Sequence, residues 1–201
     1  QASGKMVNMR EALDARRALG DDTGTAHTLT NLGRLYRRTN QLERAREVCA
    51  EAIALLDGSV ESSALASAHA AMGEIFEMEG DFAGAEEAFR IALRINESLG
   101  LPDVIALSLT QLARILINRG ELPAAERYAQ RSLDENDRAS NREGVIASNH
   151  LLGRIYGLTG RTDLAISLLE RAADDYVEVR NPTGEAWARL HLAKVQKQAG
   201  H

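Results

Sequence analysis

The chain has 201 residues, of which 44% are hydrophobic, 26% charged and only 4% aromatic, and its formal net charge is −5 at pH 7. No run of apolar residues approaches the length of about 18 that a membrane-spanning helix needs, which excludes such a helix. The single cysteine, Cys49, excludes an intramolecular disulfide framework and a cysteine-rich zinc site. Few aromatics and three prolines disfavour a β-sandwich or barrel, so we expect a soluble, cytoplasmic, helical protein.

A period of forty residues organises the chain. Gly33, Gly73 and Gly153 are spaced by multiples of forty, and each is followed three residues later by an aromatic residue. Apolar positions within each period follow helical spacing, so each period predicts two amphipathic helices. The repeat positions to which we assign a structural role are Gly33, Tyr36, Ala45, Gly73, Phe76, Gly80, Ala85, Gly120, Ala125, Gly153, Tyr156, Gly160 and Ala165.

In chain order, the predicted helices cover residues 5–19, 25–39, 41–57, 62–79, 81–99, 102–119, 121–139, 142–159, 161–179 and 183–199. Asn40 and the glycines that share its column stand where a helix must end, because Gly and Asn tolerate the left-handed backbone conformation. Asn141 and Asn181 stand where N-caps are expected. These helices form a single array over 1–201. It consists of a half repeat (5–19), four full repeats (25–57, 62–99, 102–139 and 142–179) and a terminal half repeat or capping helix (183–199).

The pattern Leu32-Gly33-x-x-Tyr36, followed by Asn40 and Ala45, resembles a tetratricopeptide repeat. The usual unit of that family has about 34 residues. The forty-residue variant is similar to Leu-Gly-Asn-type scaffold repeats and to the repeat arrays of bacterial signalling NTPases and transcriptional regulators. The resemblance implies an all-α fold, a right-handed α-solenoid of antiparallel helix pairs with about ten helices. It also implies that the first helix of each repeat lines a concave groove. The half repeats at both ends lead us to expect a part of a larger protein, with capping by the terminal helices as the alternative.

Catalytic and metal-binding patterns are absent from the sequence. It contains no G-x-x-x-x-G-K-[ST], H-E-x-x-H, G-x-S-x-G or C-x-x-C pattern. Cys49 shares a column with Phe89, Ala129 and Leu169, which indicates a packing position. His27, His69, His150 and His191 lie in different repeats without an i, i+4 pair that could chelate a metal. We therefore expect no enzyme activity, no cofactor and no metal.

The helix columns that the resemblance assigns to the groove carry seven cations and two anions, a net charge of +5 in a molecule whose total is −5. Columns of arginine offer bidentate donors to carboxylates or phosphates. We therefore expect an extended acidic peptide or protein segment as the ligand, with Glu74 and Glu77 receiving a basic residue midway. The candidate groove residues are Asn31, Arg34, Arg37, Arg38, Glu74, Glu77, Gln111, Arg114, Asn118, His150, Arg154, Trp187, His191, Lys194 and Lys197.

Several alternatives remain at this point. The charged columns could instead be a solvated face whose arginines pair with acids of the adjacent repeat, and Trp187 could belong to a terminal cap. A second function is the ligand-sensing segment of a bacterial transcriptional regulator or signalling NTPase, and a third is self-association through the end helices. Nucleic acid is disfavoured because the groove lacks interleaved aromatics, and we expect no membrane partner.

Overall fold

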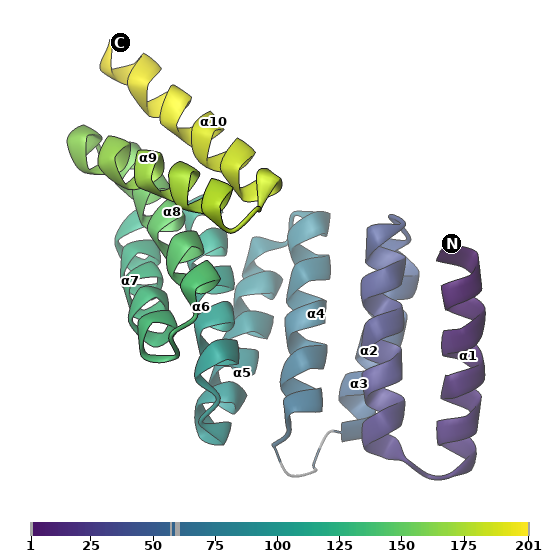
Figure 1. Cartoon of the computed structure of the whole chain (residues 1–201). Coiled ribbons are helices and arrows are strands. Elements are labelled where there is room, and N and C mark those ends of the chain that lie inside the picture. Colours follow the sequence, from purple (N-terminus) through teal and green to yellow (C-terminus); the bar gives the residue numbers. More distant parts are fainter. Residues whose placement is uncertain (1, 57, 59–60, 201) are drawn as a thin grey trace. The chain divides into compact units, whose positions relative to one another are not determined.

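The computed structural model describes residues 2–56, 58 and 61–200, and over these residues the chain forms ten helices and no strand (Figure 1). The helices are α1 (Ala2–Ala18), α2 (Asp22–Arg38), α3 (Leu42–Leu56), α4 (Ser63–Glu79), α5 (Phe82–Leu99), α6 (Pro102–Asn118), α7 (Leu122–Arg138), α8 (Arg142–Leu158), α9 (Thr162–Glu178) and α10 (Pro182–Ala199). All ten predicted helices are present, with ends shifted by at most three residues. Residues 57 and 201 lie outside the described residues.

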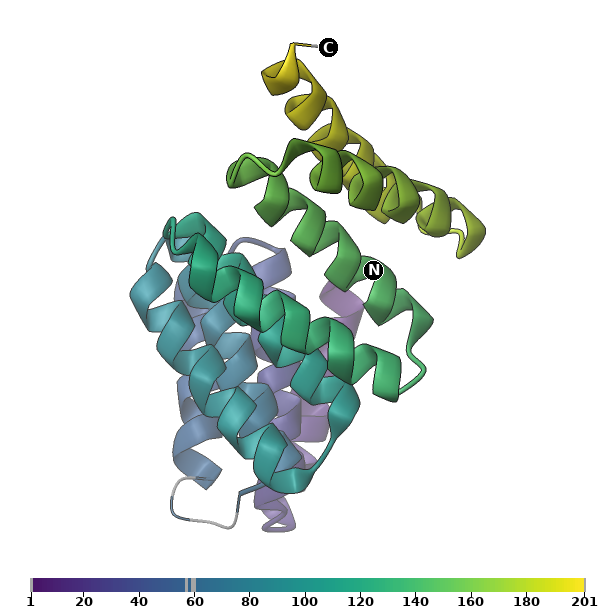
Figure 2. The same ribbon diagram turned by 90° about the vertical axis from the view of Figure 1, so that its left-hand side faces the viewer.

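The chain divides into two compact units, Gln1–Gly100 and Leu101–His201, at the boundary between two predicted repeats. In the first unit, α2 packs against α3 and α4 against α5, and α1 packs against α2. In the second unit, α6 packs against α7, α8 against α9, and α10 against α9 (Figure 2). This packing of consecutive helix pairs confirms the predicted all-α, solenoid-type fold. The single array over 1–201 stays a prediction.

The helices end at turns that recur every twenty residues. A residue with positive φ stands at positions 20, 40, 80, 100, 120, 140, 160, 180 and 200. Most of these residues are glycines, as the sequence predicts for Gly80, Gly120 and Gly160, and Asn40 adopts φ 57°. Ser140 and Arg180 adopt the same conformation with φ 53° and 56°, which the sequence did not indicate.

The predicted N-caps are also present. The side chains of Asn141 and Asn181 accept hydrogen bonds from the backbone N–H groups of Gly144 and Gly184, at 3.1 and 2.9 Å. Each cap satisfies one of the backbone donors that the first turn of a helix leaves unpaired.

Small residues set the distance between the two helices of a repeat. A Cβ added at Gly73 would stand 2.9 Å from Phe89, and one added at Gly33 would overlap the sulfur of Cys49. Gly153 meets Leu169 in the same way, at 2.9 Å. In the third repeat both positions are alanine, Ala113 on α6 and Ala129 on α7, and both are fully buried. Where the first helix has glycine, the second helix has a larger residue, and where the first helix has Ala113, the second has the smaller Ala129. This exchange of volume confirms that the column of Cys49 is a packing position.

The first helices of neighbouring repeats also contact one another, α2 with α4 in the first unit, and α6 with α8 and α8 with α10 in the second. Within each unit, the second helices make no comparable contact among the described residues. The first helices therefore form the more closely spaced layer of each unit, as expected for helices that line a concave face. The candidate groove residues all lie on these first helices.

Candidate functional site

In the first unit, two of the candidate groove cations, Arg34 and Arg37, contact neighbouring side chains of the protein itself. Arg34, half-buried on α2, donates a hydrogen bond to Ser67 Oγ on α4 at 3.0 Å. Arg37 forms an ion pair with Glu74 at 2.9 Å, and its other terminal nitrogen lies 3.8 Å from Met78 Sδ. The alternative in which groove arginines pair with acids of the adjacent repeat therefore describes Arg37 and Glu74. Glu74, which we expected to receive a basic residue of the ligand, already contacts this arginine.

The other candidates of this unit lie nearby on the same helices. Asn31 and Arg38 are exposed on α2, and Glu77 is half-buried on α4. Arg38 makes no ion pair with any described residue, so the first unit presents one cation directly to solvent beside the Arg37–Glu74 pair.

The second unit has a different arrangement, because its candidate cations on α8 and α10 form no ion pair with any residue that the structure describes. Arg114 on α6 donates to Gln111 Oε1 at 2.5 Å, and both side chains are half-buried. Arg154 on α8 is half-buried as well, and burial followed by the charge of Arg114 lowers its pKa. Lys194 is exposed on α10. Asn118 and Lys197 are likewise exposed, near the C-terminal ends of α6 and α10.

Two histidines from different repeats meet between α8 and α10. His150 Nε2 lies 2.8 Å from His191 Nδ1, and the ring of Trp187 stacks on His191 with centroids 6.0 Å apart. Tyr176 approaches His150 edge-on at 5.9 Å. Burial, followed by the neighbouring positive charges, lowers the pKa of each histidine to about 4. An i, i+4 pattern does not reveal this pair, because its separation of 41 residues is one repeat plus one residue.

A pocket of about 180 Å³ lies beside the histidine pair. Its lining residues come from α8 and α10 and are Arg154, Gly157, Leu158, His191, Lys194, Val195 and Gln198. Four of these seven residues have polar or charged side chains, and none of them is acidic. The pocket therefore brings together three candidate residues, Arg154, His191 and Lys194, that the sequence placed only in separate columns.

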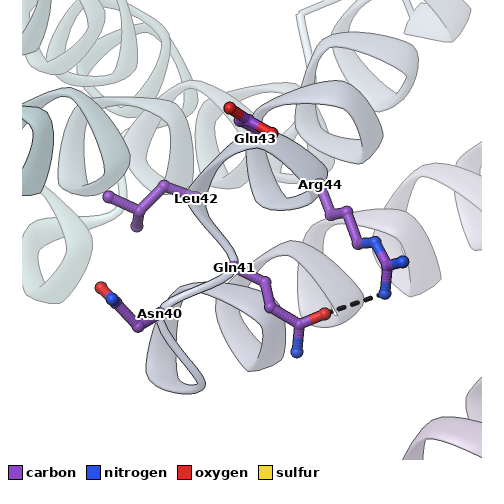
Figure 3. A pocket seen from close by; sticks show the side chains of 5 residues that line it. All are labelled: Asn40, Gln41, Leu42, Glu43 and Arg44. Atoms are coloured by element: carbon purple, nitrogen blue, oxygen red, sulfur yellow. Dashed lines mark hydrogen bonds between the residues drawn. The ribbon is translucent and has the colours of Figure 1, made fainter.

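Other hollows lack this convergence of like charges. An open hollow of about 410 Å³ lies at the turn between α2 and α3. Arg44 donates a hydrogen bond to Gln41 there at 2.9 Å, whereas Leu42 and Glu43 point away from this pair (Figure 3). Another hollow, of about 460 Å³, lies along the second helix α7 and is lined by side chains of both signs.

Metal-binding and nucleophilic groups do not form a site in the described part of the chain. Over those residues, no group of three or more His, Cys, Asp or Glu side chains is placed to hold a metal ion. Cys49 is fully buried, and burial raises the pKa of its thiol to about 12. A thiol in that state is a poor nucleophile at neutral pH. None of the helices within the described ranges is both long and apolar enough to cross a bilayer.

Comparison with known proteins supports the repeat assignment. BtubC (BKLC) from P. vanneervenii is similar in structure, with a TM-score of 0.83 and 19% identity over 100% of this chain and 85% of BtubC. A Rap protein complexed with Competence and Sporulation Factor has a TM-score of 0.75 and 14% identity over 95% of this chain and 58% of the Rap protein. At these identities the likeness shows the fold. No curated protein sequence matches the chain.

A signal-transduction ATPase with numerous domains (STAND) from Pyrococcus horikoshii contains a tetratricopeptide repeat sensor. It is similar with a TM-score of 0.78 and 16% identity, over 87% of this chain and 27% of the ATPase. The family model of the MalT-like TPR region matches residues 26–198. This match spans all four predicted full repeats and most of the last helix, and the chain therefore belongs to the MalT-like TPR region family.

Proposed function

We propose that the protein is a non-catalytic scaffold that binds an extended, acidic segment of a protein or peptide on the basic surface of its first helices. The observation that carries this proposal is the state of Arg154, Lys194 and Lys197, none of which has an ion-pair partner among the described residues. Unpaired cations on one surface attract anionic partners and accelerate their association. The Rap protein, whose structure was solved with Competence and Sporulation Factor bound, supports ligand binding by this fold.

The two units contribute unequally to this function. In the first unit, Arg37 is paired with Glu74 and Arg34 donates to Ser67, so a ligand would have to displace these contacts. In the second unit, Arg154 and Lys194 are available without such a rearrangement. The second unit therefore offers an acidic ligand two cations that it can reach without breaking an existing contact.

The experiment is a charge-reversal series read by fluorescence anisotropy. The probe is a labelled peptide of about 12 residues in which Glu and Ser alternate, and a Lys/Ser peptide of the same length is the negative control. We expect the triple variant Arg154→Glu, Lys194→Glu, Lys197→Glu to lose most of the affinity and its salt dependence. Arg127→Glu on the outer helix α7 is the matched control. Unchanged affinity and unchanged salt dependence in the triple variant would refute the proposal.

A second candidate function is a ligand-sensing segment of a larger regulator. The match to the MalT-like TPR region and the similarity to the STAND sensor favour it. The sequence of the full-length gene product distinguishes the scaffold from the sensing segment. A nucleotide-binding or DNA-binding domain in it would favour the sensing segment, because ligand binding would then control that domain. Small-angle scattering with and without ligand would then show a change in shape, which a passive scaffold lacks.

Self-association is a third candidate, and one feature of α10 favours it. Ala193 and Trp187 are exposed on this helix, and the exposed fraction of Trp187 is 53%. Leu190 is 43% exposed on the same helix. This candidate requires a mass that rises with protein concentration in sedimentation velocity and returns to the monomer value in Ala193→Glu.

A further inference from the structure

The pocket between α8 and α10 owes its space to a glycine. Gly157 faces Val195, and a Cβ added at 157 would stand 2.5 Å from Val195 Cγ2. The absence of a side chain allows the two helices to approach and leaves a hollow of about 180 Å³ whose walls include Leu158. Arg154 and Lys194 line this hollow from opposite helices.

The equivalent place in the first unit is closed. Three repeats earlier, 120 residues towards the N-terminus, Arg34 stands at the position equivalent to Arg154, and Arg37 at the position equivalent to Gly157. Glu74 stands where the second unit has Lys194. In the first unit the long side chain of Arg37 occupies this region and pairs with Glu74 at 2.9 Å. At these positions the first unit thus has a net charge of +1 and the long side chain of Arg37, whereas the second unit has two cations beside an open hollow.

Positive charge accumulates around this pocket without compensation. The charge of Arg154 acts on both His150 and His191, that of Lys194 acts on His191, and that of Arg114 acts on Arg154. Every one of these influences comes from a cationic or titratable basic group, and no carboxylate lines the pocket. A half-buried arginine in this position is costly without an anion, because like charges repel more strongly where water is partly excluded.

The number and geometry of the cations favour a doubly charged ligand. A carboxylate of Asp or Glu carries one negative charge and would neutralise only one of the two cations that line the pocket, Arg154 and Lys194. A phosphoryl group on a side chain carries a charge of about −1.5 to −2 at pH 7 and has three acceptor oxygens. A guanidinium binds two phosphoryl oxygens in parallel, and an ammonium binds a phosphoryl group as a point charge. The two donors approach from different helices, which suits a tetrahedral group better than a planar one.

We propose that this pocket binds the phosphoryl group of a phosphorylated side chain in the bound peptide. The proposal rests on the proposed function, since it specifies which acidic group the second unit prefers. Arg154 supplies a bidentate contact and Lys194 the second charge. Leu158 and Val195 form the apolar walls beside them.

The test compares three labelled peptides of one sequence that carry phosphoserine, aspartate or serine at the central position, with glutamates elsewhere. We expect the phosphoserine peptide to bind on the order of tenfold more tightly than the serine peptide, and several-fold more tightly than the aspartate peptide. Inorganic phosphate at millimolar concentration should reduce the phosphoserine advantage in competition.

Two variants test whether the tighter binding of the phosphoserine peptide depends on the pocket. Lys194→Glu copies the residue that the first unit has at this position and should abolish the phosphoserine advantage. Lys197→Glu makes the same change in charge one helical turn further along α10, outside the pocket lining. It should weaken all three peptides by similar factors and preserve their order. Circular dichroism of both variants checks that the helices are intact.

The outcomes separate this inference from the proposed function. Equal binding of the phosphoserine and aspartate peptides would overturn the phosphoryl pocket and leave the acidic-segment scaffold standing. A phosphoserine advantage that survives in Lys194→Glu would place the phosphoryl group elsewhere and overturn it as well. Competition by inorganic phosphate without any phosphoserine advantage would indicate a free anion as the ligand, against the proposal. Failure of all three glutamate-containing peptides to bind would refute the proposed function itself.

Discussion

His150 Nε2 and His191 Nδ1 lie 2.8 Å apart, in a hydrogen bond that joins the first helices of two successive repeats. Such a bond needs one nitrogen with a proton and one without, so the two rings cannot both be protonated while it persists. The nearby charges of Arg154 and Lys194 disfavour a further proton. Double protonation therefore breaks this contact between α8 and α10, and the neighbouring charges favour the neutral form of the pair.

This arrangement predicts a loss of stability in mild acid. The pKa of each histidine is lowered to about 4 in the folded protein, against about 6.5 in an unfolded chain. Between these values the unfolded state binds more protons, so the free energy of unfolding rises with pH and falls as the pH decreases from about 6.5 towards 4. We expect a loss of roughly 1–3 kcal/mol for the pair over that window, because a tenfold change in proton affinity corresponds to about 1.4 kcal/mol and partial exposure to solvent reduces the effect.

Urea unfolding at pH 7, 6 and 5 measures this effect, and the variant His191→Gln should show a shallower pH dependence than the parent protein. Solution NMR titration of the imidazole signals provides the direct check. Midpoints near 6.5 for both His150 and His191 would contradict the prediction.

The contact between Gly33 and Cys49 predicts a rescue by paired substitution. Gly33→Ala places a methyl group against the cysteine sulfur in a fully buried contact, and overpacking of this kind costs about 1–3 kcal/mol. The third repeat has Ala113 and Ala129 at the equivalent positions. We therefore expect the double variant Gly33→Ala, Cys49→Ala to recover most of the loss.

A double-mutant cycle measured by thermal or urea unfolding tests this coupling. The Cys49→Ala single variant is the control, because it leaves a cavity without relieving any overlap. Additive effects of the two substitutions would show that the helices move apart instead of exchanging volume between the two positions.

Much of the fold could be predicted from the sequence because its determinants are local and recur. The turn at Gly80, where α4 ends and the chain reverses, needs a positive φ. A column of glycines in the repeats predicts such a turn, because glycine adopts positive φ readily. The packing role of Cys49 follows in the same way from its equivalents Phe89 and Leu169. Ser140 and Arg180 were missed because their turns have the same backbone without the residue that signals it.

The candidate site was predictable as a set of columns but not as a set of contacts. Whether Arg37 faces solvent or reaches Glu74 depends on side-chain rotamers and on the distance between α2 and α4. The sequence left both states open, and the structure shows the paired one. The meeting of His150 with His191 could have been found by searching at the repeat period instead of within a helix.

At equivalent positions of the turns, substitutions to and from glycine are expected to change the free energy of unfolding in opposite directions. Ser140 and Arg180 have φ near 55°, a conformation that costs an L-residue with a Cβ more than it costs glycine. We expect Ser140→Gly and Arg180→Gly each to raise the free energy of unfolding by about 0.5–1 kcal/mol. Gly120→Ala, at φ 79°, should lower it by about 1 kcal/mol. Urea unfolding midpoints measure all three, and a stabilising Gly120→Ala would show that the turn relaxes to a different conformation.

A polar cluster in the core of the second unit contains a serine at a position where the other repeats have alanine. Ser132 is fully buried, and its column contains Ala52, Ala92 and Ala172 in the other repeats. Substitution towards a repeat consensus commonly stabilises a protein. Here Ser132 Oγ donates to the carbonyl oxygen of Ala106 at 3.0 Å, and lies 2.8 Å from Thr110 Oγ1.

The same oxygen lies 3.1 Å from Ser148 Oγ, and it accepts a hydrogen bond from Asn136 Nδ2 at 3.4 Å. We expect Ser132→Ala to lower the free energy of unfolding by about 1–2 kcal/mol, because it removes hydrogen bonds from buried groups that water does not reach. Urea unfolding and amide hydrogen exchange in α6 to α8 measure the loss. The further change Ser148→Ala in that background should cost less than in the parent protein, since its partner is already gone. A stabilised Ser132→Ala would mean that apolar packing outweighs the cluster.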